Sequence, residues 1–489
     1  MLDDRMTARL AEALRAADFT ANRAYELMGD QAHRALARNQ VVPALRSTRG
    51  GSPTEVLIRL FSLQVPVDRV AADRALPGLV EAMTAAEMLT VSGGEVSARV
   101  DIRPYGDDDH DWWVVCDATP GLGGQVDTMD PLHVLGISEA SSSLAQLVVR
   151  DRVGAALDLG TGCGVQALHL AQHVEHVVAT DVNPRALAMA DLTGRLNGVS
   201  FDVRDGSLFE PVAGERFDLI ATNPPFVISP PGSPVLIYRD SGMPGDAVVR
   251  HIVENSVDHL NPGGWCQILA NWAIRGDRSW QDELAGWVDG RDLDAWVVQR
   301  EMADPAEYVE MWLADAGVPP GLERLHRYDA WLDWFEAEGI TGVGFGWLSL
   351  GRLDTAGAHS MTRFEEWTGP LAPPIGRAVA AWGRAVDLLR DVPDDDLRDL
   401  VLTARPMAQE TIGRVGVEDP ERIVLHLSQG VRRARQVDTV EAALVGACDG
   451  DLAVGQILDA LGELLGTSDL SASALPAVRS LIEEGFLTP

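Results

Sequence analysis

An apolar segment followed by alternating glycines limits most strongly how this chain can fold. Residues 155–159 read Ala-Ala-Leu-Asp-Leu, the glycine-rich run 160–164 follows, and helical character begins at Val165. Alternating glycines let the backbone approach a ligand closely and present the N-terminus of the next helix to it. The pattern predicts a strand, a turn and a helix of an α/β fold. Dinucleotide-binding folds share it, so it does not identify a ligand alone. The candidate ligand-binding positions of this segment are Asp158, Gly160, Thr161, Gly162 and Gly164.

Polar residues follow the next two predicted strands. Residues 177–180 are mostly apolar and lead to Asp181, where a carboxylate could accept both hydroxyls of a ribose. Asn183 can cap the following helix, and Pro184 suits the first turn of that helix. A third strand leads to Asp205 and Ser207, where we expect a contact with the amino group of an adenine.

A fourth apolar run, residues 217–222, ends in Asn223-Pro224-Pro225-Phe226. Alone this segment could be a turn after a strand, because asparagine and proline are common turn residues. The side-chain carbonyl of Asn223 and the backbone carbonyl of Pro224 nevertheless supply two hydrogen-bond acceptors close together. The prolines restrict the backbone and offer no competing N–H groups. The ring of Phe226 adds a face on which a planar group can stack.

The segments LDLGTGCG, TDVNPRAL, DGSLFEP and TNPPF resemble, in this order, the successive motifs of class I S-adenosylmethionine-dependent methyltransferases. The resemblance covers residues 132–269. More narrowly, it is to the branch with an Asn-Pro-Pro-Tyr or Asn-Pro-Pro-Phe signature. That branch contains the HemK/PrmC-type glutamine methyltransferases of release factors, the small-domain methyltransferases that modify guanine in ribosomal RNA, and adenine methyltransferases.

The resemblance implies a Rossmann-like, seven-stranded sheet and S-adenosyl-L-methionine as the cofactor. It also implies a role for each motif. Asp158 and the glycines of the run 160–164 line the methionine part of the cofactor, Asp181 binds its ribose, and Asn223 to Phe226 hold the target nitrogen. The candidate cofactor-binding residues are therefore Asp158, Gly160, Thr161, Gly162, Gly164, Asp181, Asn183, Asp205, Ser207 and Asn223.

The resemblance predicts an N-methyltransferase but leaves its acceptor open. An amide or ring amino nitrogen is a poor nucleophile because its lone pair is delocalised, and acceptors that hold its N–H groups orient it for reaction. The segment NPPFVISPP resembles the eukaryotic HemK-like release-factor enzymes, whereas Phe226 in place of tyrosine resembles the guanine-modifying enzymes. We expect a protein glutamine side chain as the acceptor, with a base of ribosomal RNA, transfer RNA or DNA as the alternative. A catalytically silent binding protein and a small-molecule acceptor are further alternatives.

The charge of the chain favours a protein acceptor. The sequence contains 40 basic residues, all of them arginine, and 73 acidic residues, which gives a formal net charge of −33 at pH 7. A field of this sign repels a phosphate backbone. One basic cluster, Arg432, Arg433 and Arg435, could contact RNA or form the solvated face of a strand. The absence of lysine indicates a GC-rich, bacterial coding sequence.

The length of 489 residues predicts more than one domain. We expect a mainly helical N-terminal domain over residues 1–100, a methyltransferase domain over 101–368 and an α+β domain over 369–489. Helices followed by a glycine-tipped hairpin at 89–100, and a similar arrangement at 475–487, resemble winged helices. The first could equally be a lid or a dimerisation element.

The N-terminal sequence lacks the apolar core of a signal peptide, and no long uncharged apolar stretch occurs. We therefore expect a cytoplasmic protein with no membrane span. The cysteines have no C-x-x-C spacing, so we expect neither a disulfide framework nor a metal site.

The connection between the predicted sixth strand, 294–300, and the predicted seventh, 341–350, is longer than this link requires. Its segment 301–340 predicts two inserted helices, whose aromatic side chains either form a core of their own or recognise the substrate. These aromatic residues are Tyr308, Trp312, Tyr328, Trp331, Trp334 and Phe335.

Overall fold

The computed structural model describes residues 1–107, 109–122, 130–232, 237–240, 242–276, 278–390, 392–415, 420–467 and 470–489. Its largest sheet has eight strands in the order β13-β11-β12-β10-β9-β6-β7-β8. Parallel pairing joins β8 to β7, β7 to β6, β6 to β9 and β9 to β10. The strands are β6 (Val153–Leu159), β7 (Val174–Asp181), β8 (Asp202–Asp205), β9 (Phe217–Thr222), β10 (Leu260–Arg275), β11 (Leu293–Ala303), β12 (Ile340–Arg352) and β13 (Thr362–Glu366).

This sheet confirms the predicted α/β class and has one strand more than the seven that we expected. The additional strand, β13, pairs in parallel with β11 and places Thr362 opposite Ala295. Its sequence, Thr-Arg-Phe-Glu-Glu, is mostly polar, so it lacks the apolar pattern by which an inner strand is recognised. By contrast, β6, β7 and β9 contain runs of buried apolar residues, as parallel strands covered on both faces require.

Helices pack beside the strands that form the site. α8 (Val165–Leu170) contacts β6 and β7, and α9 (Pro184–Leu196) contacts β7 and β8. α10 (Ala247–His259) and α11 (Trp280–Val288) contact β10, while α7 (Glu139–Leu147) precedes β6 in the chain. A short 3-10 helix, Glu210–Val212, follows β8. As predicted, Asn183 caps α9 and Pro184 is its first residue.

The chain divides into two compact units. The first comprises residues 1–145, 152–291 and 301–348, and the second comprises residues 146–151, 292–300 and 349–489. The three domains 1–100, 101–368 and 369–489, and the winged-helix character of the outer two, stay predictions.

The N-terminal part of the first unit is mainly helical. The predicted hairpin is formed by β2 (Leu89–Ser92) and β3 (Glu95–Ala98), which pair antiparallel. They form a small sheet with β1 (Val67–Asp68). A second antiparallel hairpin consists of β4 (Val100–Gly106) and β5 (Asp111–Asp117). It is linked to α9 through the C-cap residue Asn197, whose Nδ2 donates to the Trp113 carbonyl at 2.8 Å. The N-terminal helices are α1 (Asp4–Ala16), α2 (Ala21–Leu36), α3 (Val42–Ser47), α4 (Pro53–Leu57) with the π-helical turn Ile58–Ser62, α5 (Arg69–Ala75) and α6 (Val80–Ala85).

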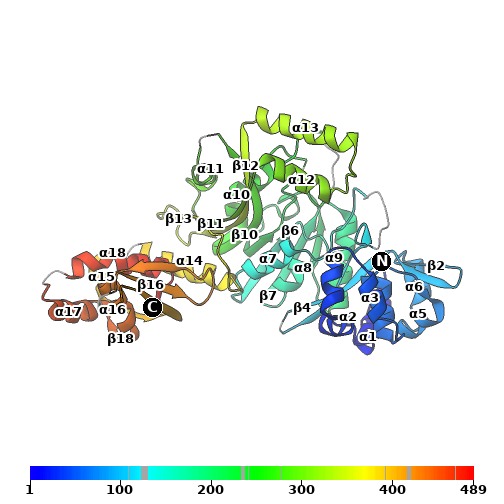
Figure 1. The fold of residues 1–489 in the computed structure, drawn as a ribbon, viewed down its shortest axis with the longest axis horizontal. Coiled ribbons are helices and arrows are strands. Elements are labelled where there is room, and N and C mark those ends of the chain that lie inside the picture. Colours follow the sequence, from blue (N-terminus) through cyan, green and yellow to red (C-terminus); the bar gives the residue numbers. More distant parts are fainter. Residues whose placement is uncertain are drawn as a thin grey trace. The chain divides into compact units, whose positions relative to one another are not determined.

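The two inserted helices predicted for 301–340 are α12 (Pro305–Asp315) and α13 (Leu322–Ala337), both in the first unit (Figure 1). Tyr308, Trp331 and Phe335 are buried in one hydrophobic cluster, which also contains Val227 and Ile228. The aromatic core predicted for this insertion is therefore present, and it includes residues that follow Phe226.

The second unit contains two small antiparallel sheets in the orders β18-β14-β19 and β15-β16-β17. The basic cluster predicted at 432–435 is mostly neutralised within this unit. Arg433 forms an ion pair with Glu365 at 2.7 Å, and Arg435 forms ion pairs with Glu441 and Glu484. The elements are α14 (Gly376–Arg390), α15 (Asp394–Asp399), β14 (Val401–Ala404), β15 (Met407–Ile412), β16 (Arg422–Leu427), β17 (Ala434–Val437), α16 (Thr439–Ala447), β18 (Asp449–Ala453), α17 (Val454–Leu465), α18 (Leu470–Glu483) and β19 (Leu487–Thr488).

Across the described part of the chain, no helix combines the length and the apolar character that crossing a membrane requires. The described residues also contain no group of three or more histidine, cysteine, aspartate or glutamate side chains that could bind a metal ion.

Candidate active site

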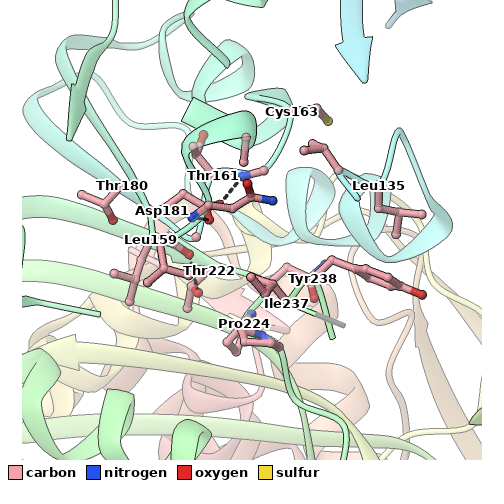
Figure 2. Close-up of a pocket in the computed structure, with 18 of the residues that line it drawn as sticks. Leu135, Leu159, Thr161, Cys163, Thr180, Asp181, Thr222, Pro224, Ile237 and Tyr238 are labelled. Atoms are coloured by element: carbon pink, nitrogen blue, oxygen red, sulfur yellow. Dashed lines mark hydrogen bonds between the residues drawn. The ribbon is translucent and has the colours of Figure 1, made fainter. Parts of the chain in front are cut away.

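A cavity of about 380 Å³ lies at the C-terminal ends of β6, β7 and β9. Segments 133–136, 159–163, 180–183, 206–208 and 222–225 line it. In a parallel sheet the ends of neighbouring strands meet at one edge, where α/β folds bind their ligands. Figure 2 shows the lining side chains, which include Leu159 from β6, Asp181 from β7 and Thr222 from β9. The hydroxyl of Thr222 donates to the Leu159 carbonyl at 2.8 Å and so ties β9 to β6.

The glycine-rich turn lies at one side of this cavity. The N–H of Gly162 donates to Oδ2 of Asp181 at 2.9 Å. Gly162 has φ +55° and Gly164 has φ +85°, a region that side chains other than glycine rarely adopt. A Cβ on Gly164 would also lie 3.1 Å from Cα of Ala190 in α9. Glycine therefore allows the turn to pack against α9 and to leave the cavity open.

Asp158 does not line the cavity. Its Oδ2 accepts hydrogen bonds from the Thr161 hydroxyl at 2.7 Å and from the Ala167 N–H at 3.0 Å. Burial raises the pKa of this carboxyl to about 7, because the charged form loses its hydration. The structure therefore places Asp158 beneath the turn, where it fixes the shape of the turn, whereas Thr161 lines the cavity.

Asp181 and Asn183, at the C-terminal end of β7, both line the cavity. Oδ1 of Asp181 accepts from the Asn183 N–H at 2.9 Å. Burial raises the pKa of Asp181, while hydrogen bonds from the Asn183 and Gly162 N–H groups act in the opposite direction. The amide Nδ2 of Asn183 donates to the Leu132 carbonyl at 2.9 Å, which fixes the segment that covers the cavity.

The two residues predicted after β8 differ in position. Ser207 is exposed and lines the cavity, whereas Asp205 is exposed at the end of β8 and does not line it. Sequence alone locates the end of a strand but does not determine which of its neighbouring side chains faces the cavity.

Asn223, Pro224 and Pro225 line the cavity at the end of β9. The Oδ1 atom of Asn223 is buried and makes no hydrogen bond to any residue that the structure describes. A buried carbonyl without a partner costs free energy of roughly 1–3 kcal/mol unless a ligand or water satisfies it. Phe226 is half-buried and does not line the cavity. Its ring meets that of Trp312 edge to face, with the centroids 6.3 Å apart.

Two segments that line the cavity were not predicted from the sequence. Residues 133–136 precede α7, and Ile237, Tyr238 and Asp240 follow the proline motif at a distance in sequence. Asp240 begins a short acidic segment, 240–246, that no spacing rule assigns to a ligand. Residue 241 of that segment lies outside the described residues.

A family model described as the methyltransferase small domain matches residues 135–285, which include most of the residues that line the cavity. Two further models, each described as a domain of unknown function, match residues 16–99 and 380–489.

Relatives of the chain modify protein or RNA. The release factor glutamine methyltransferase of Geobacter sulfurreducens is 36% identical over 23% of this chain and 44% of its own length. The ribosomal protein uL3 glutamine methyltransferase of Bradyrhizobium diazoefficiens is 33% identical over 35% of this chain and 57% of its own length. The ribosomal RNA small subunit methyltransferase C of Salmonella arizonae is 32% identical over 28% of this chain and 36% of its own length. The chain thus spans about half or less of the length of these relatives.

Solved structures match parts of the chain at low identity and with low TM-scores. The YcgJ protein of Bacillus subtilis has 13% identity and a TM-score of 0.30, covering 44% of this chain and 99% of that protein. A T. thermophilus 16S rRNA methyltransferase in complex with AdoMet and guanosine has 18% identity and a TM-score of 0.27, covering 47% of this chain and 64% of that protein.

Proposed function

We propose that this chain is an S-adenosylmethionine-dependent enzyme that methylates a planar amide or amino nitrogen, and that a protein glutamine side chain carries this nitrogen. The match of residues 135–285 to the methyltransferase small domain and the relatives named as methyltransferases support this proposal. The observation on which the proposal rests is the buried Oδ1 of Asn223, which has no partner among the described residues and belongs to a side chain that lines the cavity. An acceptor N–H would satisfy this atom.

The residues around the cavity fit S-adenosyl-L-methionine. Gly160, Thr161 and Gly162 offer a turn without bulky side chains, and Asp181 has a carboxylate at the end of β7. Each oxygen of Asp181 accepts one backbone hydrogen bond, and a carboxylate oxygen can accept a second. Asp181 would bind the ribose hydroxyls, with Asn183 fixing the backbone beside it. Ser207, which lines the cavity, would contact the adenine.

When bound, this cofactor supplies an electrophilic methyl group. Asn223 accepts one N–H of the acceptor through Oδ1, and the Pro224 carbonyl accepts the other. Holding both N–H groups directs the nitrogen lone pair toward the cofactor side of the cavity and lowers the barrier without a general base. The proton leaves after transfer, when the nitrogen is cationic and acidic. Pro225 restricts this backbone, and Phe226 is assigned to the edge of the acceptor site.

The choice between protein and RNA rests on charge and on the relatives. The formal charge of −33 disfavours a phosphate backbone, and two relatives are named for glutamine side chains of proteins. An RNA base is the second candidate, because Phe226 resembles the guanine-modifying enzymes and another relative is named for ribosomal RNA. The cytoplasmic location that we expect from the N-terminal sequence stays a prediction.

Methyl transfer from radiolabelled S-adenosylmethionine into an extract of the source organism, depleted of this protein, tests the proposal. We expect label that protease removes and nuclease does not. We expect Asn223→Ala to reduce the rate about 100- to 1,000-fold, as the loss of one preorganised hydrogen-bonding group does. Calorimetry should show that this variant still binds the cofactor, because Asn223 is assigned to the acceptor.

Asn255→Ala on α10 is the matched control, since among the described residues the Asn255 amide bonds within its own helix, to the His251 carbonyl at 2.8 Å. Label released by nuclease would replace the protein acceptor with RNA or DNA. Full activity of Asn223→Ala would contradict the assignment of the acceptor site.

A further inference from the structure

Two short segments form one wall of the cavity beside Asn223. The Val227 N–H donates to the Arg239 carbonyl at 3.0 Å, and Phe226 and Asp240 form an antiparallel bridge. We call residues 223–228 and 237–240 the acceptor wall, because the first segment contains Asn223 and the second contributes Ile237, Tyr238 and Asp240 to the lining. A ladder this short has few hydrogen bonds of its own to stabilise it.

The inserted helices form hydrogen bonds with both backbone groups of Ile228, its N–H and its carbonyl. The Ile228 N–H donates to the Tyr308 hydroxyl of α12 at 2.8 Å, and the Trp331 Nε1–H of α13 donates to the Ile228 carbonyl at 3.1 Å. Tyr308 and Ile228 are fully buried. The Tyr308 hydroxyl also accepts from Nδ2 of Asn271 in β10 at 2.9 Å, which connects the insertion to the central sheet.

The insertion also binds the second segment of the wall. Nη1 of Arg239 donates to the Trp312 carbonyl at 2.9 Å and to the Asp315 carboxylate at 3.2 Å, both in α12. The hydroxyl of Tyr238, which lines the cavity, donates to the same Asp315 carboxylate at 3.0 Å. The Arg239 guanidinium lies 5.6 Å from the centre of the Trp312 ring.

We propose that the insertion α12–α13 positions the acceptor wall, with Tyr308 and Asp315 as its positioning residues. A cluster that only needed to fill volume would not require hydroxyl, indole and carboxylate groups directed at the wall. Proline restricts the backbone between Asn223 and Ile228, so fixing Ile228 limits where the Asn223 carbonyl can lie. The inference rests on the proposed function only in naming this wall as the acceptor side.

Tyr308→Phe tests the proposal, because it keeps the ring and removes the hydroxyl. The variant leaves the buried Ile228 N–H without its hydrogen-bond acceptor. We therefore expect the rate of amide hydrogen exchange in 223–228 and 237–240 to rise about tenfold or more. Exchange of the glycine turn 159–165 and the affinity for S-adenosylmethionine should change less than about twofold. In the radiolabel assay, kcat should fall about tenfold or more while the KM for the cofactor stays unchanged.

Tyr328→Phe is the matched control, since this tyrosine of α13 bonds through its hydroxyl to the exposed Glu310 carboxylate at 3.1 Å. Asp315→Asn is a second test that does not open the core, because the Asp315 side chain is 42% exposed and Arg239 keeps its ion pair with Asp240 at 3.1 Å. It should raise exchange of 237–240 with no loss of thermal stability beyond that of the control. Unchanged exchange of the wall in both variants, or an equal rise in the wall and the glycine turn, would overturn the proposal. The exchange result does not require methyl transfer, so it separates this inference from the proposed function.

Discussion

Asp158 shows how a buried carboxyl can shape a site that it does not line. Its Oδ2 fixes Thr161 and the start of α8, so the turn keeps its form through one acceptor atom. Burial raises the pKa of Asp158 to about 7, against an ordinary value near 3.8. A carboxyl whose folded pKa is raised is protonated more readily in the folded state than in the unfolded state. The folded state therefore loses stability as pH rises from the unfolded pKa through the folded pKa.

We predict that between pH 5.5 and pH 8 the wild type loses about 2 kcal/mol of unfolding free energy relative to Asp158→Asn, since the variant cannot ionise there. Urea denaturation of both proteins at the two pH values measures the difference. Equal loss in the two proteins would show that Asp158 does not titrate in this range.

At the residue scale, the sequence predicts where the acidic residues and glycines near the cavity lie along the chain, but not which side chains face the cavity. Gly160, Thr161, Gly162, Asp181, Asn183, Ser207, Asn223, Pro224 and Pro225 line the cavity, and Asp158, Gly164, Asp205 and Phe226 do not. Strand ends follow from apolar runs, because each run must be buried in the sheet. Whether a neighbouring side chain such as that of Asp205 faces the cavity depends on tertiary packing. The ring of Phe226, for example, packs against Trp312, a residue distant in sequence.

At the element scale, the inner strands and the insertion were predictable and β13 was not. β6, β7 and β9 carry their own apolar signal, whereas β13 is held by partners that no local pattern reveals. Glu365 of β13 pairs with Arg433 through both carboxylate oxygens, at 2.7 and 2.8 Å, and accepts from Trp296 Nε1 of β11 at 2.9 Å. Arg363 lies 3.1 Å from the same carboxylate. Burial alone would raise the pKa of Glu365, but the hydrogen bond from Arg433 and the two arginine charges hold it below its ordinary value.

Glu365→Gln should therefore destabilise the second unit by about 3 kcal/mol, because it leaves the buried Arg433 without a counter-charge. A group with a lowered folded pKa stabilises the protein above its unfolded pKa and loses that effect as pH falls through the folded pKa. The difference between wild type and variant in urea denaturation should be full at pH 7 and should shrink below about pH 4. Glu421→Gln is the control, since its partner Arg414 is 80% exposed and such pairs contribute less than about 1 kcal/mol. An equal effect of the two changes would contradict the role of Glu365.

At the scale of the whole molecule, charge separates the two candidate acceptors. The formal charge of −33 is spread over a chain in which Arg433 and Arg435 of the basic cluster are already paired with glutamates. Arg432 is exposed and has no ion-pair partner in the part of the chain that the structure describes, but one guanidinium neutralises little of a phosphate backbone. Affinity for nucleic acid depends on the number of phosphates neutralised and decreases steeply with salt.

We predict that the full chain binds a fluorescent single-stranded or duplex RNA more weakly than about 10⁻⁴ M at physiological salt, the weak limit for non-specific binding. Fluorescence anisotropy at 50 and 200 mM salt measures this, with an arginine-rich peptide as the positive control. Micromolar binding that weakens steeply between the two salt concentrations would reveal a local basic surface. If Arg432→Glu abolished that binding, the RNA base would replace the glutamine side chain as the preferred acceptor, and Asn223 would keep the same role toward its amino group.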